Sequence, residues 1–186
     1  MKLNRIVFRY GQRLKKPIFA ILLLLILFQI GREALLSPDP EPILEEGMVQ
    51  VQRVVDGDTL LLTNGVRVRL MGVDTPECVK PNSPVEPFGL EASAYTKAAI
   101  EASRYQVRLR LDREREDKFG RKLAYVYVFN PEQNEYRLLN EDLIRLGLGR
   151  ALLTFNYSSS MKTRFERAQN AAIQESRGIW GLLICI

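Results

Sequence analysis

Residues 49–73 read VQVQRVVDGDTLLLTNGVRVRLMGV and hold the clearest structural signal of the chain. Two apolar runs flank Asn64-Gly65, and an Asn-Gly pair between such runs is a strong signal for a β-hairpin. Another strand precedes the hairpin, because Val49 and Val51 alternate with glutamines. The stretch therefore predicts three consecutive antiparallel strands.

The rest of the chain predicts one helix, two more strands and two final helices. Apolar spacing favours a helix over 88–103, and residues 107–111 and 123–129 have the patterns of strands. Asn140 and Ser160 are the predicted N-caps of the last two helices. This order is that of the oligonucleotide-binding architecture. The sequence thus predicts an α+β fold, a five-stranded OB-fold β-barrel with three α-helices.

The composition divides the chain into three predicted parts. Residues 1–36 hold seven Lys or Arg against one acid, which gives this leader a charge of +6 within a chain total of +5. Residues 37–47 are rich in proline and acids and are typical of a linker. Residues 48–186 form the predicted domain. Because the residues after the leader carry about −1, any nucleic-acid site must be a local patch.

The leader predicts export. Basic residues precede an apolar run over 18–30, which is shorter than the roughly 20 residues of a transmembrane helix. It fits the apolar region of a secretory signal. The positive-inside rule then predicts an exported domain, either secreted or anchored to the membrane by an uncleaved segment. A buried or amphipathic N-terminal helix is the alternative.

The absence of histidine excludes several site classes. No Ser-His or Cys-His catalytic pair and no His-ligated zinc is available, and two cysteines cannot complete a zinc site. A metal would have to bind carboxylates, carbonyls and water, which suits hard cations such as calcium, magnesium or manganese.

Two acidic clusters, DGDT at 56–59 and DTPE at 74–77, follow predicted strands. A two-residue turn at Asn64-Gly65 would place Asp58 opposite Met71, so both clusters would lie at the same end of the hairpin. Crowded carboxylates are tolerated when a cation binds them or when one is protonated. A simple turn is the alternative for the first cluster.

Two arginines lie close to these clusters in the sequence. Arg69 is on the strand that leads to Asp74, and Arg121 follows a short polar loop. A guanidinium matches two phosphate oxygens and stays charged. Surface arginines on strands are often simply solvated, and composition does not separate these two from the others.

Six motifs in order, RVVDGDTLLL, RLMGVDTPE, EPFGLEASAYTK, DKFGRKLAYVYV, LIRLGLGRA and RGIW, resemble the staphylococcal nuclease (thermonuclease) family over residues 48–182. The resemblance implies the barrel with three helices and a calcium-dependent endonuclease. Its implied substrates are single-stranded or unwound DNA and RNA, cleaved with little sequence specificity to leave 3′-phosphates. One Ca²⁺ ion is expected, ahead of Mg²⁺ or Mn²⁺, in a monomeric protein.

The resemblance also implies roles for the acidic residues. Asp58, Asp74 and the backbone carbonyl of Thr75 correspond to calcium ligands, and Asp56 to a nearby acid behind them. Glu77 corresponds to the carboxylate that positions or deprotonates the attacking water.

The same match implies that Arg69 and Arg121 grip the scissile phosphate and stabilise the transition state. Lys118 and Phe119 lie in a segment similar to the nucleotide-contacting loop of the family.

The chain departs from the family in two places. Leu153 and Phe155 stand where the family has nucleotide-contacting tyrosines, so Phe155 or Tyr157 is expected to stack on a base instead. Cys78 and Cys185 form an isolated pair, which in an exported protein suggests a disulfide; two unpaired thiols are the alternative.

The leading functional hypothesis is therefore an exported, metal-dependent nuclease. The alternatives are a catalytically silent nucleic-acid-binding OB-fold module tethered at the membrane, and an adaptor that uses the barrel only as a scaffold.

Overall fold

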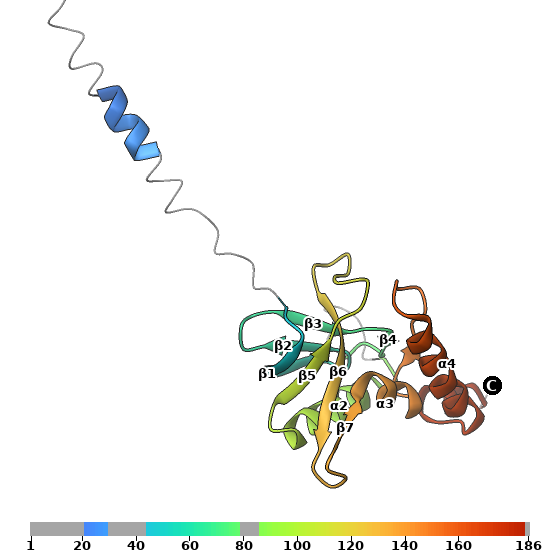
Figure 1. Ribbon diagram of the computed structural model, residues 1–186. Helices are drawn as coiled ribbons and strands as arrows, with labels where there is room; N and C mark the ends of the chain where they lie inside the picture. Colours follow the sequence, from blue (N-terminus) through green and yellow to red (C-terminus); the bar gives the residue numbers. More distant parts are fainter. Residues whose placement is uncertain (1–20, 30–43, 79–85, 185–186) are drawn as a thin grey trace, which may run out of the picture. The chain divides into compact units, whose positions relative to one another are not determined.

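The computed structural model describes residues 21–29, 44–78 and 86–184 (Figure 1). The chain comprises two compact units, Met1–Glu41 and Pro42–Ile186. In the first unit, residues 21–29 are helical. No helix within the described residues is both long enough and apolar enough to span a membrane. The basic part of the leader and most of the predicted linker lie outside the described residues.

The second unit is built on a five-stranded barrel. Its strands are β1 (Gly47–Asp56), β2 (Thr59–Leu62), β3 (Arg67–Leu70), β5 (Gln106–Arg110) and β6 (Lys122–Asn130). They pair in the order β3-β2-β1-β5-β6, and a parallel pairing of β3 with β6 closes the barrel. The predicted OB-fold barrel is confirmed.

Three short strands lie outside the barrel. β7 (Glu135–Leu138) extends the sheet beyond β6, and β4 (Val73–Asp74) pairs with β8 (Arg150–Ala151) in a separate two-stranded sheet. This small sheet connects the segment after the hairpin to the C-terminal part of the domain.

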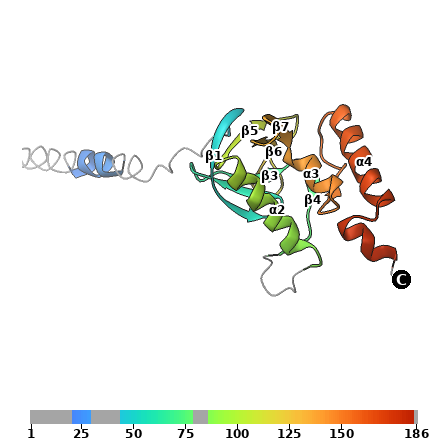
Figure 2. The same ribbon diagram turned by 90° about the horizontal axis from the view of Figure 1, so that it is seen from below.

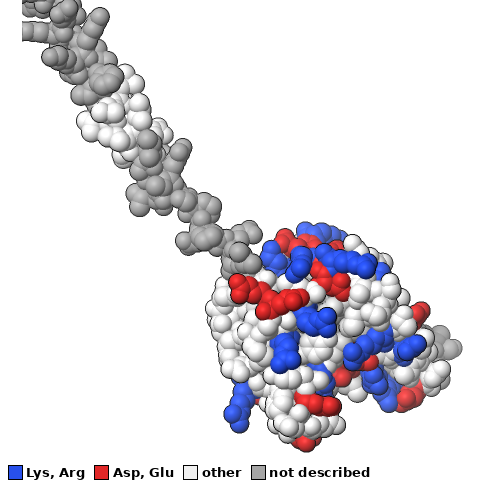
Figure 3. Space-filling view, in the orientation of Figure 1, with Lys and Arg blue, Asp and Glu red and all other residues white. Residues whose placement is uncertain are grey.

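The helices are α2 (Gly89–Ala102), α3 (Leu139–Arg145), α4 (Ser159–Gln174) and the 3₁₀ helix η1 (Gly178–Ile184). Figure 2 shows α3 between the barrel and α4, and α3 contacts both β6 and α4. This arrangement explains why β6 is buried over Leu123–Val126, with the barrel interior on one side and α3 on the other. The face of the domain in Figure 3 carries charges of both signs.

The hairpin turn is one residue longer than predicted. Leu60, and not Leu61, lies opposite Val68. The Leu62 N–H donates to the Val66 carbonyl at 2.9 Å, which leaves a three-residue turn that ends at Gly65 with φ +84°. A residue of positive φ at this place is typical of a three-residue hairpin loop, and glycine adopts it without strain.

The corrected register changes the partner of Asp58. Its carbonyl accepts the Leu70 N–H at 2.8 Å, so Asp58 lies opposite Leu70 and not Met71. It remains at the open end of the hairpin, next to the segment that leads to Asp74.

Both predicted N-caps are wrong. Asn140 lies inside α3, whose N-cap is Leu138, and Ser160 lies one residue inside α4, whose N-cap is Ser158. The buried Asn140 side chain accepts the Val126 N–H at 2.9 Å and donates to the Met71 carbonyl at 2.8 Å. An amide both donates and accepts, so it satisfies buried backbone groups that a helix cap would leave unpaired.

Candidate active site

The turn between β1 and β2 places Asp58 against the segment that follows β4. Asp56 Oδ1 accepts the Gly57 N–H at 2.8 Å. A Cβ at Gly57 would lie 2.7 Å from Thr75 Oγ1 and 2.9 Å from Ala92 Cβ. Glycine therefore lets this turn approach Thr75 and α2 closely, and Asp58 is buried beside them with 4% of its surface exposed.

Asp58 is held from two sides. Its Oδ1 accepts the Thr59 hydroxyl at 2.8 Å, and its Oδ2 lies 3.0 Å from Arg69 Nη1. Burial raises the pKa of Asp58 to about 6, although the charge of Arg69 acts in the opposite direction. The carboxylate is therefore only partly compensated by the protein.

Arg69 joins the two acidic clusters. Its Nη2 donates to Asp74 Oδ1 at 2.5 Å, so one guanidinium contacts the carboxylates of Asp58 and Asp74. The Arg69 side chain is 8% exposed, whereas Arg67 on the same strand is exposed. Arg69 Nε is buried without a hydrogen-bond partner among the described residues. The structure thus separates Arg69 from the solvated arginines of the strands.

The segment after β4 carries Thr75 and Glu77 along the start of α2. Thr75 is buried, and Glu77 is exposed. The Glu77 carbonyl accepts the Glu86 N–H at 3.0 Å, and the Glu77 N–H donates to Glu86 Oε2 at 3.3 Å. A Cβ at Gly89 would lie 2.8 Å from the Glu77 carbonyl oxygen, so glycine permits this close packing. The backbone of Glu77 is fixed next to Asp74.

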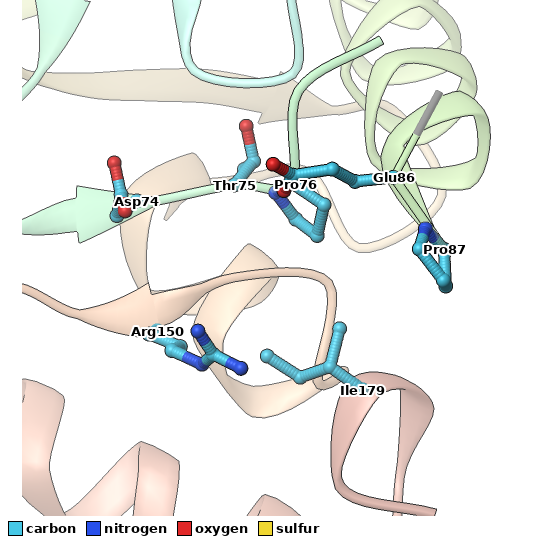
Figure 4. A pocket seen from close by; sticks show the side chains of 7 residues that line it. All are labelled: Asp74, Thr75, Pro76, Glu86, Pro87, Arg150 and Ile179. Atoms are coloured by element: carbon cyan, nitrogen blue, oxygen red, sulfur yellow. The ribbon is translucent and has the colours of Figure 1, made fainter. Parts of the chain in front are cut away.

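A pocket of about 270 Å³ opens beside this segment (Figure 4). Arg150 lies opposite Asp74 in the pairing of β4 with β8, and its guanidinium lies 5.7 Å from the centre of the Trp180 ring. In Figure 4, Arg150 and Ile179 face the β4 segment across the pocket. The lining residues are Asp74, Thr75, Pro76, Glu86, Pro87, Arg150 and Ile179.

Arg121 is positioned by Asp117, a residue that the sequence analysis missed. Asp117 Oδ2 accepts Arg121 Nε at 2.7 Å, and Oδ1 accepts the backbone N–H groups of Phe119 and Arg121. These bonds hold the pKa of Asp117 below its usual value, although burial acts to raise it. The Asp-x-x-Gly pattern that ends at Gly120 is a turn signature and could have indicated this role.

The pairing of β3 with β6 brings Arg121 toward Arg69. Leu123 lies beside Arg69 in this parallel pairing, so Arg121 is two residues before the residue that pairs with Arg69. Its guanidinium contacts Asp117 and the ring of Phe119. No contact within the described residues joins it to Asp58 or Asp74.

Phe119 presents an exposed ring flanked by cations. It is 71% exposed, with Lys118 Nζ at 5.0 Å and Arg121 Cζ at 5.4 Å from the ring centre. An exposed aromatic ring next to two positive charges offers a stacking surface to a base and compensation to a phosphate.

The aromatic residues after β8 differ in their availability. Tyr157 is 2% exposed and packs against Tyr125 and Phe165 in the core. The prediction that Tyr157 stacks on a base is therefore wrong for this structure, because its ring is part of the hydrophobic core. Phe155 is half-buried against the core, and Leu153 is exposed.

Cys78 is a free thiol in this structure, and its Sγ donates to Asp56 Oδ1 at 3.0 Å. Burial and the neighbouring Asp56 raise the pKa of this thiol. Cys185 lies outside the described residues, so the disulfide remains a prediction.

Comparison with known proteins assigns the chain to a family. A family model described as "Staphylococcal nuclease homologue" matches residues 67–181. The chain belongs to the staphylococcal nuclease family. The thermonuclease of Staphylococcus intermedius is 42% identical over 133 residues, which cover 70% of this chain and 74% of that protein.

Two further similar proteins are also named as nucleases. The thermonuclease of Staphylococcus hyicus is 38% identical over 138 residues, which cover 73% of this chain and 76% of that protein. Endonuclease YncB of Bacillus subtilis strain 168 is 35% identical over 136 residues, covering 71% of this chain and 61% of that protein.

The resemblance to staphylococcal nuclease implies a metal, and the donor chemistry of the site fits a hard cation. The described residues contain no group of three or more His, Cys, Asp or Glu side chains placed to hold a metal. They do bring the carboxylates of Asp58 and Asp74 onto one guanidinium, with buried Thr75 next in the chain. Two carboxylates and a backbone carbonyl are all-oxygen donors, which suit a hard cation, and burial raises the pKa of Asp58 although Arg69 compensates part of its charge.

Proposed function

We propose that this chain is an exported, calcium-dependent endonuclease that hydrolyses phosphodiester bonds of DNA and RNA with little sequence specificity. Its products would carry 3′-phosphates. The observation that carries the proposal is the group formed by Asp58, Arg69 and Asp74, with Glu77 three residues beyond Asp74. Family membership and relatives named as thermonucleases and endonucleases support it.

In this proposal Asp58, Asp74 and the Thr75 carbonyl hold the cation. A bound Ca²⁺ supplies positive charge that polarises a phosphoryl oxygen and a site that orients the substrate. Asp58 is already desolvated and Asp74 is exposed, so one ligand is rigid and the other faces the incoming substrate. Magnesium or manganese is the less favoured alternative.

Glu77 positions the attacking water and accepts its proton. Its side chain is exposed, so water reaches the carboxylate, and its backbone is held by bonds to Glu86. Arg69 and Arg121 bind the phosphate. Without substrate, both terminal nitrogens of Arg69 contact carboxylates, those of Asp58 and Asp74. During the reaction, a phosphate oxygen replaces at least one of these carboxylates as the partner of Arg69.

Phe119 and Lys118 bind the nucleotide next to the scissile phosphate. The exposed ring accepts a base by stacking, and the Lys118 ammonium, 5.0 Å from the ring centre, would contact the adjoining phosphate. Phe155 contributes a second, half-buried apolar surface.

Export is proposed from the leader, in which basic residues precede the apolar run over 18–30. Protease added to intact cells should digest the nuclease domain of an anchored chain, or the domain should appear in the medium. A domain that stays protected until the cells are lysed would contradict export.

The test of the enzymatic proposal is digestion of single-stranded DNA and RNA by the full chain with calcium, with magnesium and with EDTA. Glu77→Gln and Arg121→Ala should each lower the calcium-dependent rate by at least about 100-fold, the size expected for a lost general base or electrostatic contact. Exposed Glu135→Gln and Arg104→Ala are matched controls and should keep the rate.

An inert wild-type chain that still binds DNA would overturn the enzymatic proposal. That outcome would favour the alternative of a catalytically silent binding module. Products with 5′-phosphates would contradict the proposed cleavage position while leaving nuclease activity in place.

A further inference from the structure

A basic cavity lies between α3 and α4, apart from the candidate active site. A cavity of about 410 Å³ opens there, and none of its lining residues belongs to the pocket in Figure 4. Three arginines, one glutamate and two hydroxyl side chains dominate its lining. They are Arg145, Arg164, Arg167, Glu141, Ser160 and Thr163.

Glu141 organises two of the arginines. It is 8% exposed, and its Oε1 accepts Arg145 Nη2 at 2.6 Å. Its Oε2 accepts Arg164 Nε at 2.8 Å and Nη2 at 2.5 Å. One buried carboxylate thus fixes a guanidinium from each of two helices. Each guanidinium has five N–H donors, so both keep donors that Glu141 does not use.

The positive charge of the cleft exceeds its negative charge. The side chains of Arg145 and Arg164 are 53% and 47% exposed, so about half of each side chain is open to solvent. Arg167 lies three residues after Arg164 on the same helix, is exposed, and has no carboxylate partner among the described residues. The three arginines and one glutamate that line the cavity therefore sum to a charge of about +2.

A structural ion pair between α3 and α4 does not explain this excess. Linking the helices requires Glu141 and Arg164 only, whereas Arg167 adds a further positive charge to the lining of the same cavity. The chain outside the leader carries about −1, so the cleft is not representative of the domain surface. In Figure 3, several Lys and Arg side chains lie on the right of the domain, with acidic side chains among them.

We propose that the cleft between α3 and α4 binds a backbone phosphate of the nucleic-acid strand, outside the candidate active site. This inference rests on the proposed function, because it concerns the same substrate. Guanidinium groups with neighbouring hydroxyls are suited to phosphate oxygens, and preorganisation by Glu141 reduces the entropy lost on binding. The cleft would strengthen the binding of long strands and leave the chemistry at the active site unchanged.

The test compares Arg167→Gln with the control Arg104→Gln, an exposed arginine that follows α2. Arg167 is chosen because its removal leaves the ion pairs of Glu141 intact. The affinity of the full chain for a single-stranded oligonucleotide of about 20 nucleotides, longer than an OB-fold site, is measured in EDTA at several salt concentrations. Loss of one phosphate contact should reduce the slope of log affinity against log salt by about 0.7.

We expect Arg167→Gln to weaken the binding of the long strand several-fold at low salt and Arg104→Gln to leave it unchanged. Neither substitution should change the binding of an oligonucleotide of about four nucleotides, which fills only one site. An equal slope for Arg167→Gln and the wild type would overturn the inference, as would an equal loss for long and short strands.

Two other outcomes separate this inference from competing explanations. Binding of the full chain to vesicles of phosphatidylglycerol and phosphatidylcholine tests whether a membrane surface supplies the phosphate. An effect of Arg167→Gln on vesicles and none on the oligonucleotide would overturn the inference. A wild-type chain without nuclease activity in calcium, whose salt slope still falls with Arg167→Gln, would refute the proposed function and support the cleft.

Discussion

Arg69 shows how burial selects one side chain from several that look alike in the sequence. It is one of many arginines on predicted strands, and its charge alone does not distinguish it. The structure buries it between the carboxylates of Asp58 and Asp74, whereas Arg67 stays in solvent. Its guanidinium therefore balances two acids that would otherwise repel each other.

Arg69→Gln should lower the free energy of unfolding in EDTA by about 3 kcal/mol, because it leaves a buried carboxylate without its partner. Calcium should narrow the difference from the wild type, since a cation would neutralise the same two carboxylates. Thermal and urea unfolding with and without calcium measure both effects. Arg67→Gln is the control on the same strand, and equal stability of the two variants would contradict this account.

Phe119→Ala should weaken the binding of single-stranded oligonucleotides about tenfold, since a stacked base contributes about 1–3 kcal/mol. The exposed ring makes little contact with the core, so the unfolding temperature should stay unchanged. Fluorescence anisotropy in EDTA measures the affinity. Unchanged affinity would remove Phe119 from the nucleotide site.

Helix α3 is held to the barrel by polar bonds as well as by its apolar face. Leu139, Leu143 and Ile144 are fully buried, and Asn140 bonds the backbones of β6 and of the segment after β3. The helix thereby fixes the position of Met71, which precedes β4 and Asp74. The packing of this helix is thus connected to the candidate site.

Asn140→Ala should lower the free energy of unfolding by about 3 kcal/mol, because it leaves buried backbone groups without partners. Asn130→Ala is the control, since the Asn130 side chain bonds at the surface. Urea denaturation of both variants gives the comparison. A loss below about 0.5 kcal/mol for Asn140→Ala would contradict the role assigned to its bonds.

Asp112 joins the end of β5 to β6 and to the start of α4. Its Oδ2 accepts the Tyr125 hydroxyl at 2.8 Å and the Ser158 N–H at 3.0 Å. Burial acts to raise the pKa of Asp112, but these bonds outweigh it and hold the pKa below the ordinary value of 3.8. The ionised carboxylate therefore stabilises the fold above that pH, and this contribution is lost as the pH falls through the folded-state pKa.

Asp112→Asn should lower stability by about 1 kcal/mol at pH 7, less than a fully buried charged hydrogen bond contributes, because solvent screens this partly exposed carboxylate. The difference from the wild type should shrink as the pH falls below 3.8. Urea denaturation between pH 7 and pH 3 measures this difference in stability, and Glu132→Gln at an exposed position is the control. A difference independent of pH would show that the charge of Asp112 has no part in stability.

The hydrophobic core of the described residues lies entirely in the unit of the barrel and its helices. The buried hydrophobic residues described all lie between Val51 and Ile179. The unit Pro42–Ile186 contains every one of them. Its basic cleft and its candidate active site are on this unit, so the charge of the leader does not create either.

A chain that begins at Pro42 should therefore unfold cooperatively, with a melting temperature close to that of the full chain. Circular dichroism during thermal unfolding measures this. A truncated chain that lacks a cooperative transition would show that the leader takes part in folding.

Much of the barrel could be predicted because its strands are short and their apolar patterns are local. The alternation of Val107 and Leu109 with arginines correctly gives β5, and the Asn64-Gly65 pair correctly gives the hairpin. The exact register could not be predicted, because two-residue and three-residue turns both accept Asn-Gly with a positive φ at the glycine. They differ at Asn64, which would need a positive φ in the two-residue turn and does not have one here.

The candidate site was predictable in its residue types and not in its contacts. The acidic pairs and Arg69 were visible as motifs, but Asp117 became apparent only through its bonds to Arg121. Tyr157 was misjudged because an aromatic residue in a loop has the same appearance in a sequence whether it faces solvent or the core. Burial depends on distant residues such as Tyr125 and Phe165.

The amino-acid sequence was sufficient for the strand order, the exclusion of histidine chemistry and the resemblance to staphylococcal nuclease, because these depend on local pattern and residue identity. The tertiary structure determined which charged side chains are in contact. It placed Arg69 between Asp58 and Asp74, and it gathered Arg145, Arg164 and Arg167 around one buried glutamate. Electrostatic interactions depend on distance and burial in three dimensions, and neither quantity is written in the order of the residues.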